Sequence, residues 1–441
     1  MKHDSGRFSK HVCYRWLWAG SIGVAMGGTA IAGENPAASP DAEAFKELHQ
    51  LAQFESDPVF QSERASEPSP LAGEPLLYAN AAGDPGETWG SGEPWTLADA
   101  LFDSDEPPLT IGGWTQNGYY NNSTGLFNSH PDQLVSDQNY LYIERVADGS
   151  EGLGFGFRGD ILYGADAQDT QAFGDPQAPG GGHWDNSWDN GIYGWAMPQL
   201  YGEAAYGDFS VKVGHFYTLI GYEVVTAPDN FFYSHSYTMY NSEPFTHTGA
   251  LGTYKAGENA TFYGGWVAGW DTGFAAKADL DDSRGSAFIG GTSLNVTDTL
   301  TLTYILLAGD MGIRGEGYNH SIVADWKITE KLNYIAQSDL VELNNPAFGP
   351  NHTIGFNNFL IYSVSDKLGI GGRAEWWKPN GQSVYQITGG VNIKPIANLV
   401  IRPEVRYQWG ADGVIESLAG FNGQPGVSDC AIFGIDAILT F

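Results

Sequence analysis

Cysteine and positive charge are scarce in this sequence. Its 441 residues include two cysteines, Cys13 and Cys430, and 21 basic residues against 52 acidic ones, which gives a formal net charge of −31. Cys13 lies in an N-terminal segment that we expect to be removed, so the one remaining cysteine excludes an internal disulfide. The deficit of lysine and arginine excludes the basic surface that nucleic-acid binding requires.

Long apolar runs are also lacking. After residue 32, no run approaches the roughly 18 residues of a membrane-spanning helix. If the mature chain enters a membrane, it must do so as a closed β-barrel, because only that alternative pairs every backbone group in lipid. Charged residues make up 17% of the chain, whereas glycine reaches 59 residues and aromatic residues 14%. This composition favours a large all-β structure.

Residues 1–32 have the pattern of a secretory signal peptide. Basic residues come first, an apolar stretch follows over 16–30, and Ala30-Ile31-Ala32 supplies the small residues that signal peptidase needs. We therefore expect export and cleavage after Ala32.

Residues 33–108 differ from the rest of the chain in composition. They contain 16 acidic and 2 basic residues among many Pro, Ala and Ser. Two short patches, 44–54 and 95–102, have helical spacing. We interpret this region as an acidic periplasmic linker with short helical patches rather than as a folded domain.

From residue 109 to 441, short segments alternate apolar and polar residues and are separated by Gly, Asn and Asp. In 397–410, for example, Val405 and Tyr407 share one face while Glu404 and Arg406 share the other. Such alternation is typical of strands with one apolar and one polar face. We count about sixteen segments: 109–121, 138–147, 152–164, 194–206, 208–217, 246–256, 258–270, 284–296, 299–309, 317–328, 331–343, 352–364, 366–378, 383–394, 397–410 and 430–441.

Three features favour an outer-membrane barrel over a soluble β-sandwich. Short turns alternate with long connections, as in bacterial outer-membrane barrels. The chain ends in an alternating strand that closes with Phe441. Tyrosine and tryptophan also crowd the strand ends, as aromatic girdles require, at Tyr206, Trp270, Tyr334, Trp376, Trp377 and Trp409. We predict an up-and-down antiparallel transmembrane β-barrel of about 16 strands over 109–441.

Specific runs add a family resemblance. The segments GYEVVTAPDNFFYSHSY and EPFTHTGALGTY, together with LTIGGWTQNGYY and the preceding PWTLADALF, resemble the OmpL-like family of outer-membrane β-barrel porins. The resemblance covers about 95–441. It implies a large outer-membrane barrel acting as a porin, but it implies no particular substrate.

Charged residues on the polar strand faces are candidates for lining the pore. They place opposite charges two residues apart on one face, about 7 Å from each other. They would either stabilise the barrel interior by pairing or set a transverse field across the pore. These candidates are Arg158, Asp160, Arg373, Glu375, Arg402, Glu404 and Arg406.

The longest break in the strand pattern, residues 218–245, is a candidate constriction loop. Long connections without their own elements are usually functional. Folded into the pore, this loop would control size and charge selectivity through Glu223, Asp229, His235 and Glu243. The alternative is an external loop that packs on its own aromatic residues.

The sequence indicates no metal, cofactor or catalytic site. Asp185, Ser187 and Asp189 have the spacing of a calcium loop, but the glycine falls one place late and Ala196 stands where a bidentate Glu belongs. We therefore expect an ordinary surface loop there. No G-x-S-x-G or H-E-x-x-H motif occurs, and we predict no enzymatic activity.

The function that fits these patterns is passive diffusion of small hydrophilic solutes or ions through a charged, water-filled barrel in the outer membrane. The barrel carries a net charge of about −20, which favours cations. Expected partners are outer-membrane lipid, the barrel assembly machinery and, in a homotrimer, two further copies. Two alternatives stay open: a sugar-type channel with an aromatic track at Tyr201, Phe216 and Trp377, and a non-conducting structural or adhesive barrel.

Overall fold

The structure, a computed structural model, describes only part of the chain. The predicted signal peptide and the helical patch 44–54 lie outside the described residues. Within the described residues, no helix is long and apolar enough to cross a membrane. The described residues are 94–102, 109–123, 125–172, 184–185, 188–274, 285–345, 350–410 and 429–441.

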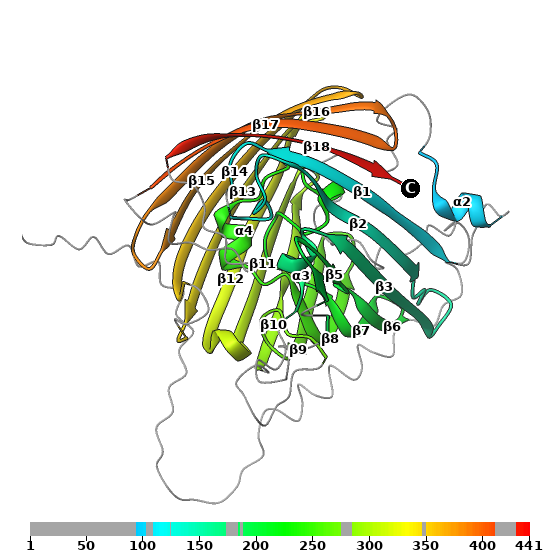
Figure 1. Cartoon of the computed structure of the whole chain (residues 1–441). Coiled ribbons are helices and arrows are strands. Elements are labelled where there is room, and N and C mark those ends of the chain that lie inside the picture. Colours follow the sequence, from blue (N-terminus) through cyan, green and yellow to red (C-terminus); the bar gives the residue numbers. More distant parts are fainter. Residues whose placement is uncertain are drawn as a thin grey trace, which may run out of the picture. The chain divides into compact units, whose positions relative to one another are not determined.

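Antiparallel strands form nearly all of the described structure (Figure 1). The strands before the longest loop are β1 (Thr110–Tyr120), β2 (Leu134–Arg145), β3 (Gly154–Gly164), β4 (Asp189–Asn190), β5 (Tyr193–Ala196), β6 (Leu200–Tyr206) and β7 (Phe209–Tyr217). Those after it are β8 (Thr246–Ala256), β9 (Ala260–Val267), β10 (Ser286–Thr297), β11 (Leu300–Asp310), β12 (Glu316–Thr329), β13 (Leu332–Leu343), β14 (His352–Ser365), β15 (Leu368–Pro379), β16 (Val384–Ile396), β17 (Leu399–Gly410) and β18 (Cys430–Thr440).

The sheet closes on itself because β1 pairs with both β2 and β18. Phe441, the last residue, exchanges two backbone hydrogen bonds with Gly113 at 2.8 and 2.9 Å. β5 and β6 both pair with β3 and act as one interrupted strand, while β4 pairs only with β5. The barrel therefore has sixteen strands, and the predicted fold class is confirmed.

Short helices and turns occupy the connections. The helices are α2 (Leu97–Leu101), α3 (Ala167–Thr170) and α4 (Tyr237–Ser242), and the 3₁₀ turns are η1 (Ala227–Asp229) and η2 (Gly312–Arg314). α2 falls inside the helical patch expected at 95–102. Just before it, the backbone of Trp95 exchanges hydrogen bonds of 3.1 and 2.8 Å with the side chain of Asn398 in the β16–β17 turn.

The two faces of each strand have opposite chemistry. On β17, Val405 and Tyr407 are 53% and 43% exposed on the outside, while Glu404 and Arg406 are buried inside. The same alternation on other strands surrounds the barrel with apolar side chains. Such a surface is suited to contact with lipid, because membrane-spanning barrels turn their apolar face outward.

Two of the tryptophans assigned to the aromatic girdle lie elsewhere. Trp376 is outward, stacked on Phe356 with ring centroids 5.6 Å apart, but its neighbour Trp377 is fully buried inside. Trp270 follows β9 and is covered by the guanidinium of Arg314, 4.7 Å from its ring. The girdle assignment was therefore wrong for Trp270 and Trp377, because proximity to a strand end does not determine the face.

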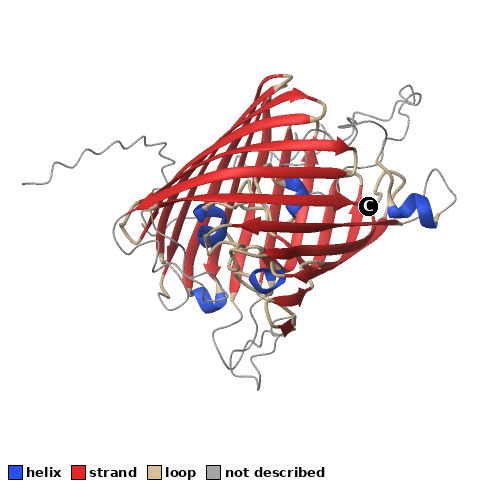
Figure 2. Cartoon of the chain, turned by 45° about the horizontal axis from the view of Figure 1, so that its top comes forward, coloured by secondary structure: helices blue, strands red, loops and turns tan. Residues whose placement is uncertain are grey.

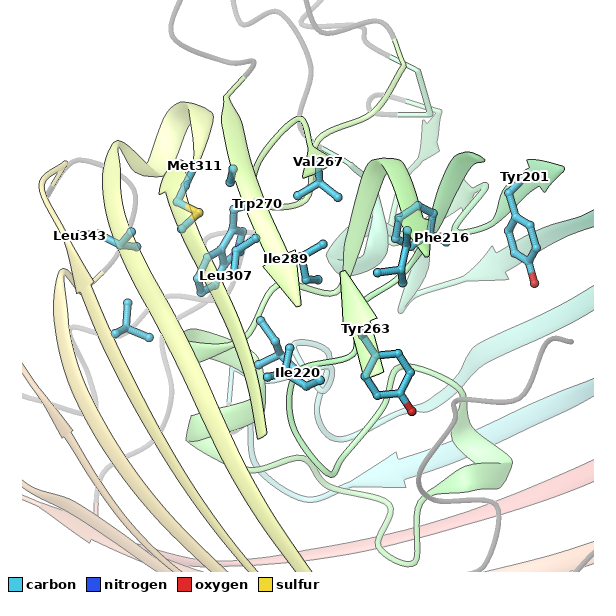
Figure 3. Packing of buried hydrophobic residues seen from close by; sticks show 14 residues of the cluster. Tyr201, Phe216, Ile220, Tyr263, Val267, Trp270, Ile289, Leu307, Met311 and Leu343 are labelled. Atoms are coloured by element: carbon cyan, nitrogen blue, oxygen red, sulfur yellow. The ribbon is translucent and has the colours of Figure 1, made fainter. Parts of the chain in front are cut away.

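The barrel interior is not polar throughout. An apolar cluster covers the inner wall from β6 to β13 and includes Leu251, Ile289, Leu307 and Trp270 (Figure 3). Ile220, from the loop between β7 and β8, packs into it. This side of the interior is therefore packed like the core of a soluble protein rather than lined with charge.

The outward position of Val405 gives a direct test of the barrel's orientation. We expect Val405→Arg to lower the free energy of unfolding from lipid vesicles by about 2–4 kcal/mol, because a charge in the middle of the lipid face is poorly solvated. Urea titration of the reconstituted protein measures this value. Val405→Leu is the control and should unfold like the wild type; equal stability of the Arg variant would contradict the assignment.

Candidate functional site

The loop between β7 and β8, residues 218–245, lies inside the barrel (Figures 1 and 2). A backbone hydrogen bond of 2.9 Å from Thr218 to Phe245 closes its base. η1 and α4 are its only regular elements, and nearly all of its side chains are buried. We call it the interior loop. Its position is the one predicted for a constriction, although its effect on conduction stays a prediction.

Arg402 on β17 joins the barrel wall to the first half of the interior loop. Its guanidinium binds the carboxylate of Asp436 on β18 at 2.6 and 3.0 Å. The same group donates to the carbonyl oxygens of Ala227 and Asn230 at 2.9 and 2.6 Å. Because Arg402 is only 2% exposed, these four bonds satisfy a charge that burial would otherwise make costly.

Two further arginines bind the middle of the interior loop. Arg373 on β15 forms an ion pair with Glu223 and donates to the carbonyl of Ser234 at 2.6 Å. Arg406 on β17 donates to the carbonyl of His235 at 2.6 Å. Both arginines are almost completely buried.

Two glutamates on the same strands, Glu404 and Glu375, accept hydrogen bonds from backbone amides of the interior loop. Glu404 accepts the amides of Tyr233 and Ser234 at 2.9 and 3.1 Å. Glu375 accepts those of Tyr237 and Thr238 at 2.9 and 2.7 Å. The amides of Tyr237 and Thr238 belong to the first turn of α4, where a negative charge is favourable. The wall thus binds the loop mainly through its backbone.

Several uncharged wall residues complete the attachment, and the sequence analysis did not single them out. Gln138 on β2 donates to the carbonyl of Val225 at 2.8 Å and accepts the amide of Ala227 at 3.2 Å. Asn319 on β12 donates to the carbonyl of Ser242 at 2.6 Å. Inward amides at alternating strand positions were the available signal, but amides carry no charge pattern that distinguishes them from other pore-lining groups.

Arg158 and Asp160 belong to a separate cluster on β3. Arg158 binds Asp160 at 2.8 Å and Glu144 on β2 at 3.4 Å. Asp160 also accepts the hydroxyl of Tyr140 at 2.5 Å and the amide of Gln199 at 2.9 Å. The structure therefore brings five of the seven predicted pore-lining residues together at the interior loop and places these two apart.

Two glutamates of the interior loop are buried in opposite electrostatic surroundings. Burial alone would raise the pKa of Glu223, but the charge of Arg373 outweighs it and holds that pKa below its ordinary value. Burial and the nearby Asp339 carboxylate raise the pKa of Glu243 well above its usual range. Gln337 donates to Glu243 at 2.5 Å. These surroundings therefore favour the ionised form of Glu223 and the protonated form of Glu243.

The other two predicted loop residues make their direct contacts away from the wall strands. Asp229 accepts the hydroxyl of Thr226 at 2.5 Å, within the loop itself. The ring of His235 lies 4.9 Å from that of Phe127. Burial lowers the pKa of His235 to about 4 despite the opposing effect of Glu223, so its ring is neutral at physiological pH.

Asp185, the first residue of the calcium-like spacing, has a structural role. Its carboxylate accepts the backbone amides of Ala172 and Met197 at 3.0 and 2.8 Å. Ser187 lies outside the described residues. Within the described ranges, no three His, Cys, Asp or Glu side chains are grouped closely enough to hold a metal ion.

Glu223 and Glu243 form a matched pair for mutagenesis. Glu223→Gln leaves the buried Arg373 without its counter-charge, so we expect it to lower the free energy of unfolding by about 3–5 kcal/mol. Glu243→Gln replaces a carboxyl whose neutral form is favoured by its surroundings, and we expect a change within about 1 kcal/mol. Chemical unfolding at pH 7 measures both.

The pH dependence provides the control for this pair. Folding raises the pKa of the Glu243 carboxyl above its ordinary value of 4.5. The folded protein therefore binds this proton more tightly than the unfolded chain does, and it loses stability as the pH rises from about 4.5 through the raised pKa. Stability of the wild type should therefore fall as the pH rises above about 4.5, by an amount that Glu243→Gln removes. Equal slopes in the two proteins would contradict protonation of Glu243.

Comparisons with known proteins agree with this architecture. A family model described as "Putative beta-barrel porin-2, OmpL-like" matches residues 108–441. An anion-selective porin from Comamonas acidovorans is similar in structure, with 11% identity, a TM-score of 0.52, and coverage of 76% of this chain and 99% of that one. A mutant porin of Rh. blastica has 12% identity, a TM-score of 0.50, and coverage of 76% and 100%. None of the curated proteins compared with the chain matches it.

Proposed function

This chain belongs to the OmpL-like β-barrel porin family, and we propose from that membership that it lets small hydrophilic solutes and ions diffuse passively across the outer membrane. The observation that carries the proposal is the interior loop, which buried charges of β15 and β17 and amides of β2 and β12 hold inside the barrel. A loop held in this way narrows the barrel, and a narrowed pore selects solutes by size and charge. The proposal includes no catalysed reaction.

Positively charged lysines on the inner face of the barrel favour the entry of anions at the end with the short turns. Lys255, Lys327 and Lys394 alternate with outward apolar neighbours close to the short turns, which face the periplasm in bacterial barrels. Lys212 lies deeper, with its ammonium 5.1 Å from the ring of Tyr201. The arginines and most inward carboxylates are instead buried. We therefore propose an anion preference, although the net charge alone favours cations.

The two alternatives differ in support. Tyr201, Phe216 and Trp377 are all at most 5% exposed. An aromatic track for sugars needs exposed rings, so these three give the sugar channel little support. A non-conducting barrel gains support from the many bonds that hold the interior loop. A homotrimer and recognition by the barrel assembly machinery stay predictions.

Conductance in a planar bilayer tests the porin proposal. We expect stable ohmic steps from the detergent-purified protein and larger or noisier steps from Glu404→Gln, because the neutral amide binds the amides of Tyr233 and Ser234 less strongly. Glu203→Gln changes an inward carboxyl on β6 away from the interior loop and is the matched control. Insertion without current would contradict an open pore and favour the structural barrel.

A salt gradient tests the sign of selectivity in the same bilayers. We expect a reversal potential that indicates anion preference, and a shift toward cations in the triple variant Lys255→Gln, Lys327→Gln and Lys394→Gln. The exposed turn residue Lys367 provides the control, since Lys367→Gln changes the same charge outside the interior. A cation-selective wild type would show that the acidic loops dominate the field.

A further inference from the structure

Two buried carboxylates meet where the interior loop ends. Glu243 follows α4, and Asp339 lies on the inner face of β13. The Nε2 atom of Gln337 donates to Oε1 of Glu243 and to Oδ2 of Asp339 at 2.5 Å each, so these two oxygens lie at most 5.0 Å apart, the sum of the two distances. Glu243 is 2% exposed and Asp339 1%. Within the described residues, neither carboxylate forms an ion pair.

Neutral side chains beside these carboxylates have polar atoms without partners. Asn357 on β14 is paired in register with Gln337 and is 1% exposed, and neither its Oδ1 nor its Nδ2 has a hydrogen-bond partner in the described structure. Asn319 on β12 donates to the carbonyl of Ser242, the residue before Glu243, at 2.6 Å. The Oδ1 atom of Asn319 has no partner among the described residues. Buried polar atoms are costly when nothing binds them.

We call Glu243, Asp339, Asn319 and Asn357 the oxygen cluster. Oδ1 of Asp339 also lacks a partner in the described part of the chain. The atoms without partners are therefore mainly acceptors, on four side chains from β12, β13, β14 and the interior loop. Two carboxylates in close proximity repel each other when both are ionised. Both features indicate that a positively charged ligand is missing from this place.

The chemistry of the oxygen cluster selects the kind of cation. Its ligating atoms are oxygens, which hard cations prefer, and it offers no sulfur. Calcium accepts irregular sets of oxygen ligands at about 2.3–2.6 Å, so two oxygens on one calcium ion lie up to about 5 Å apart. Magnesium is smaller, requires a nearly ideal octahedron and keeps several waters. A buried cluster on three strands and a loop therefore suits calcium better.

We propose that the oxygen cluster binds one calcium ion, which joins the end of the interior loop to β12, β13 and β14. Glu243 and Asp339 supply the negative charge, and Asn319 and Asn357 supply neutral oxygens. Bidentate carboxylates and water complete the ligand shell. With two carboxylates, the cluster differs from groups of three His, Cys, Asp or Glu side chains, of which the described residues contain none. Calcium binding here does not depend on conduction through the barrel.

Without the metal ion, a proton on Glu243 reduces the repulsion within the oxygen cluster. The stability changes predicted for Glu243→Gln and the pH dependence of the wild type therefore apply to protein treated with a chelator. Calcium replaces that proton, because metal ligands of this kind bind in their ionised form.

Metal analysis of the full-length, detergent-purified protein tests the proposal. The protein is equilibrated with calcium and then desalted into a magnesium buffer, which displaces calcium from exposed carboxylates. We expect one calcium ion per chain in the wild type and none in Asp339→Asn. Glu342→Gln changes an outward carboxyl of the same strand, 38% exposed, and should retain the ion. A wild type without calcium would show that the oxygen cluster holds water only, and equal retention in Asp339→Asn would also overturn the proposal.

Unfolding in urea gives a second measurement. Calcium at about 100 times its dissociation constant should shift the unfolding equilibrium of the wild type about a hundredfold toward the folded state, relative to chelator. Asp339→Asn should show no shift, while in chelator it should be at least as stable as the wild type, since it removes one of two like charges. Asn357→Ala keeps both carboxylates and should show a smaller shift than the wild type. Equal shifts in all three proteins would place the stabilising calcium elsewhere and overturn the proposal.

Discussion

The interior of this barrel depends on the bonds between buried wall charges and the backbone of one loop. Arg402 and Glu404 on β17 and Arg373 and Glu375 on β15 all contact carbonyls or amides of the loop backbone. Arg373 and Glu375 also bind the loop side chains of Glu223 and Thr238. A backbone cannot change its donors and acceptors through substitution, so the attachment depends mainly on the wall. The negative charge at the start of α4 adds a favourable contact with the helix terminus.

The opposite wall holds the same loop by a different interaction. Ile220 packs among Leu251, Ile289 and Leu307, all of which are buried. Charge therefore determines the position of the loop on one side, and apolar packing determines it on the other. Because close-packed groups are not continuously deformable, the loop forms a rigid part of the pore wall in the proposed function.

The outer surface follows a single requirement, since every lipid-facing group must do without water. Most strands meet this requirement with apolar side chains, as Val405 and Tyr407 do on β17.

The sequence by pattern predicted strands with one apolar and one polar face, a barrel of about sixteen of them, and the inward position of residues such as Arg373 and Glu404. Strand alternation has a period of two and can be read from the order of residues, while the choice of a barrel depended on the turn lengths, the aromatic residues and the final strand. It also identified residues 218–245 as the exceptional loop. Tertiary structure alone decided which groups that loop contacts, because Gln138 and Ala227 are 89 residues apart and meet only when the sheet closes. It likewise separated Arg158 from the loop-binding arginines, buried Trp377 beside the outward Trp376, and shifted the pKa values of Glu223 and Glu243 in opposite directions. Each of these depends on the distance to a neighbour remote in sequence, which the order of residues along a strand does not contain.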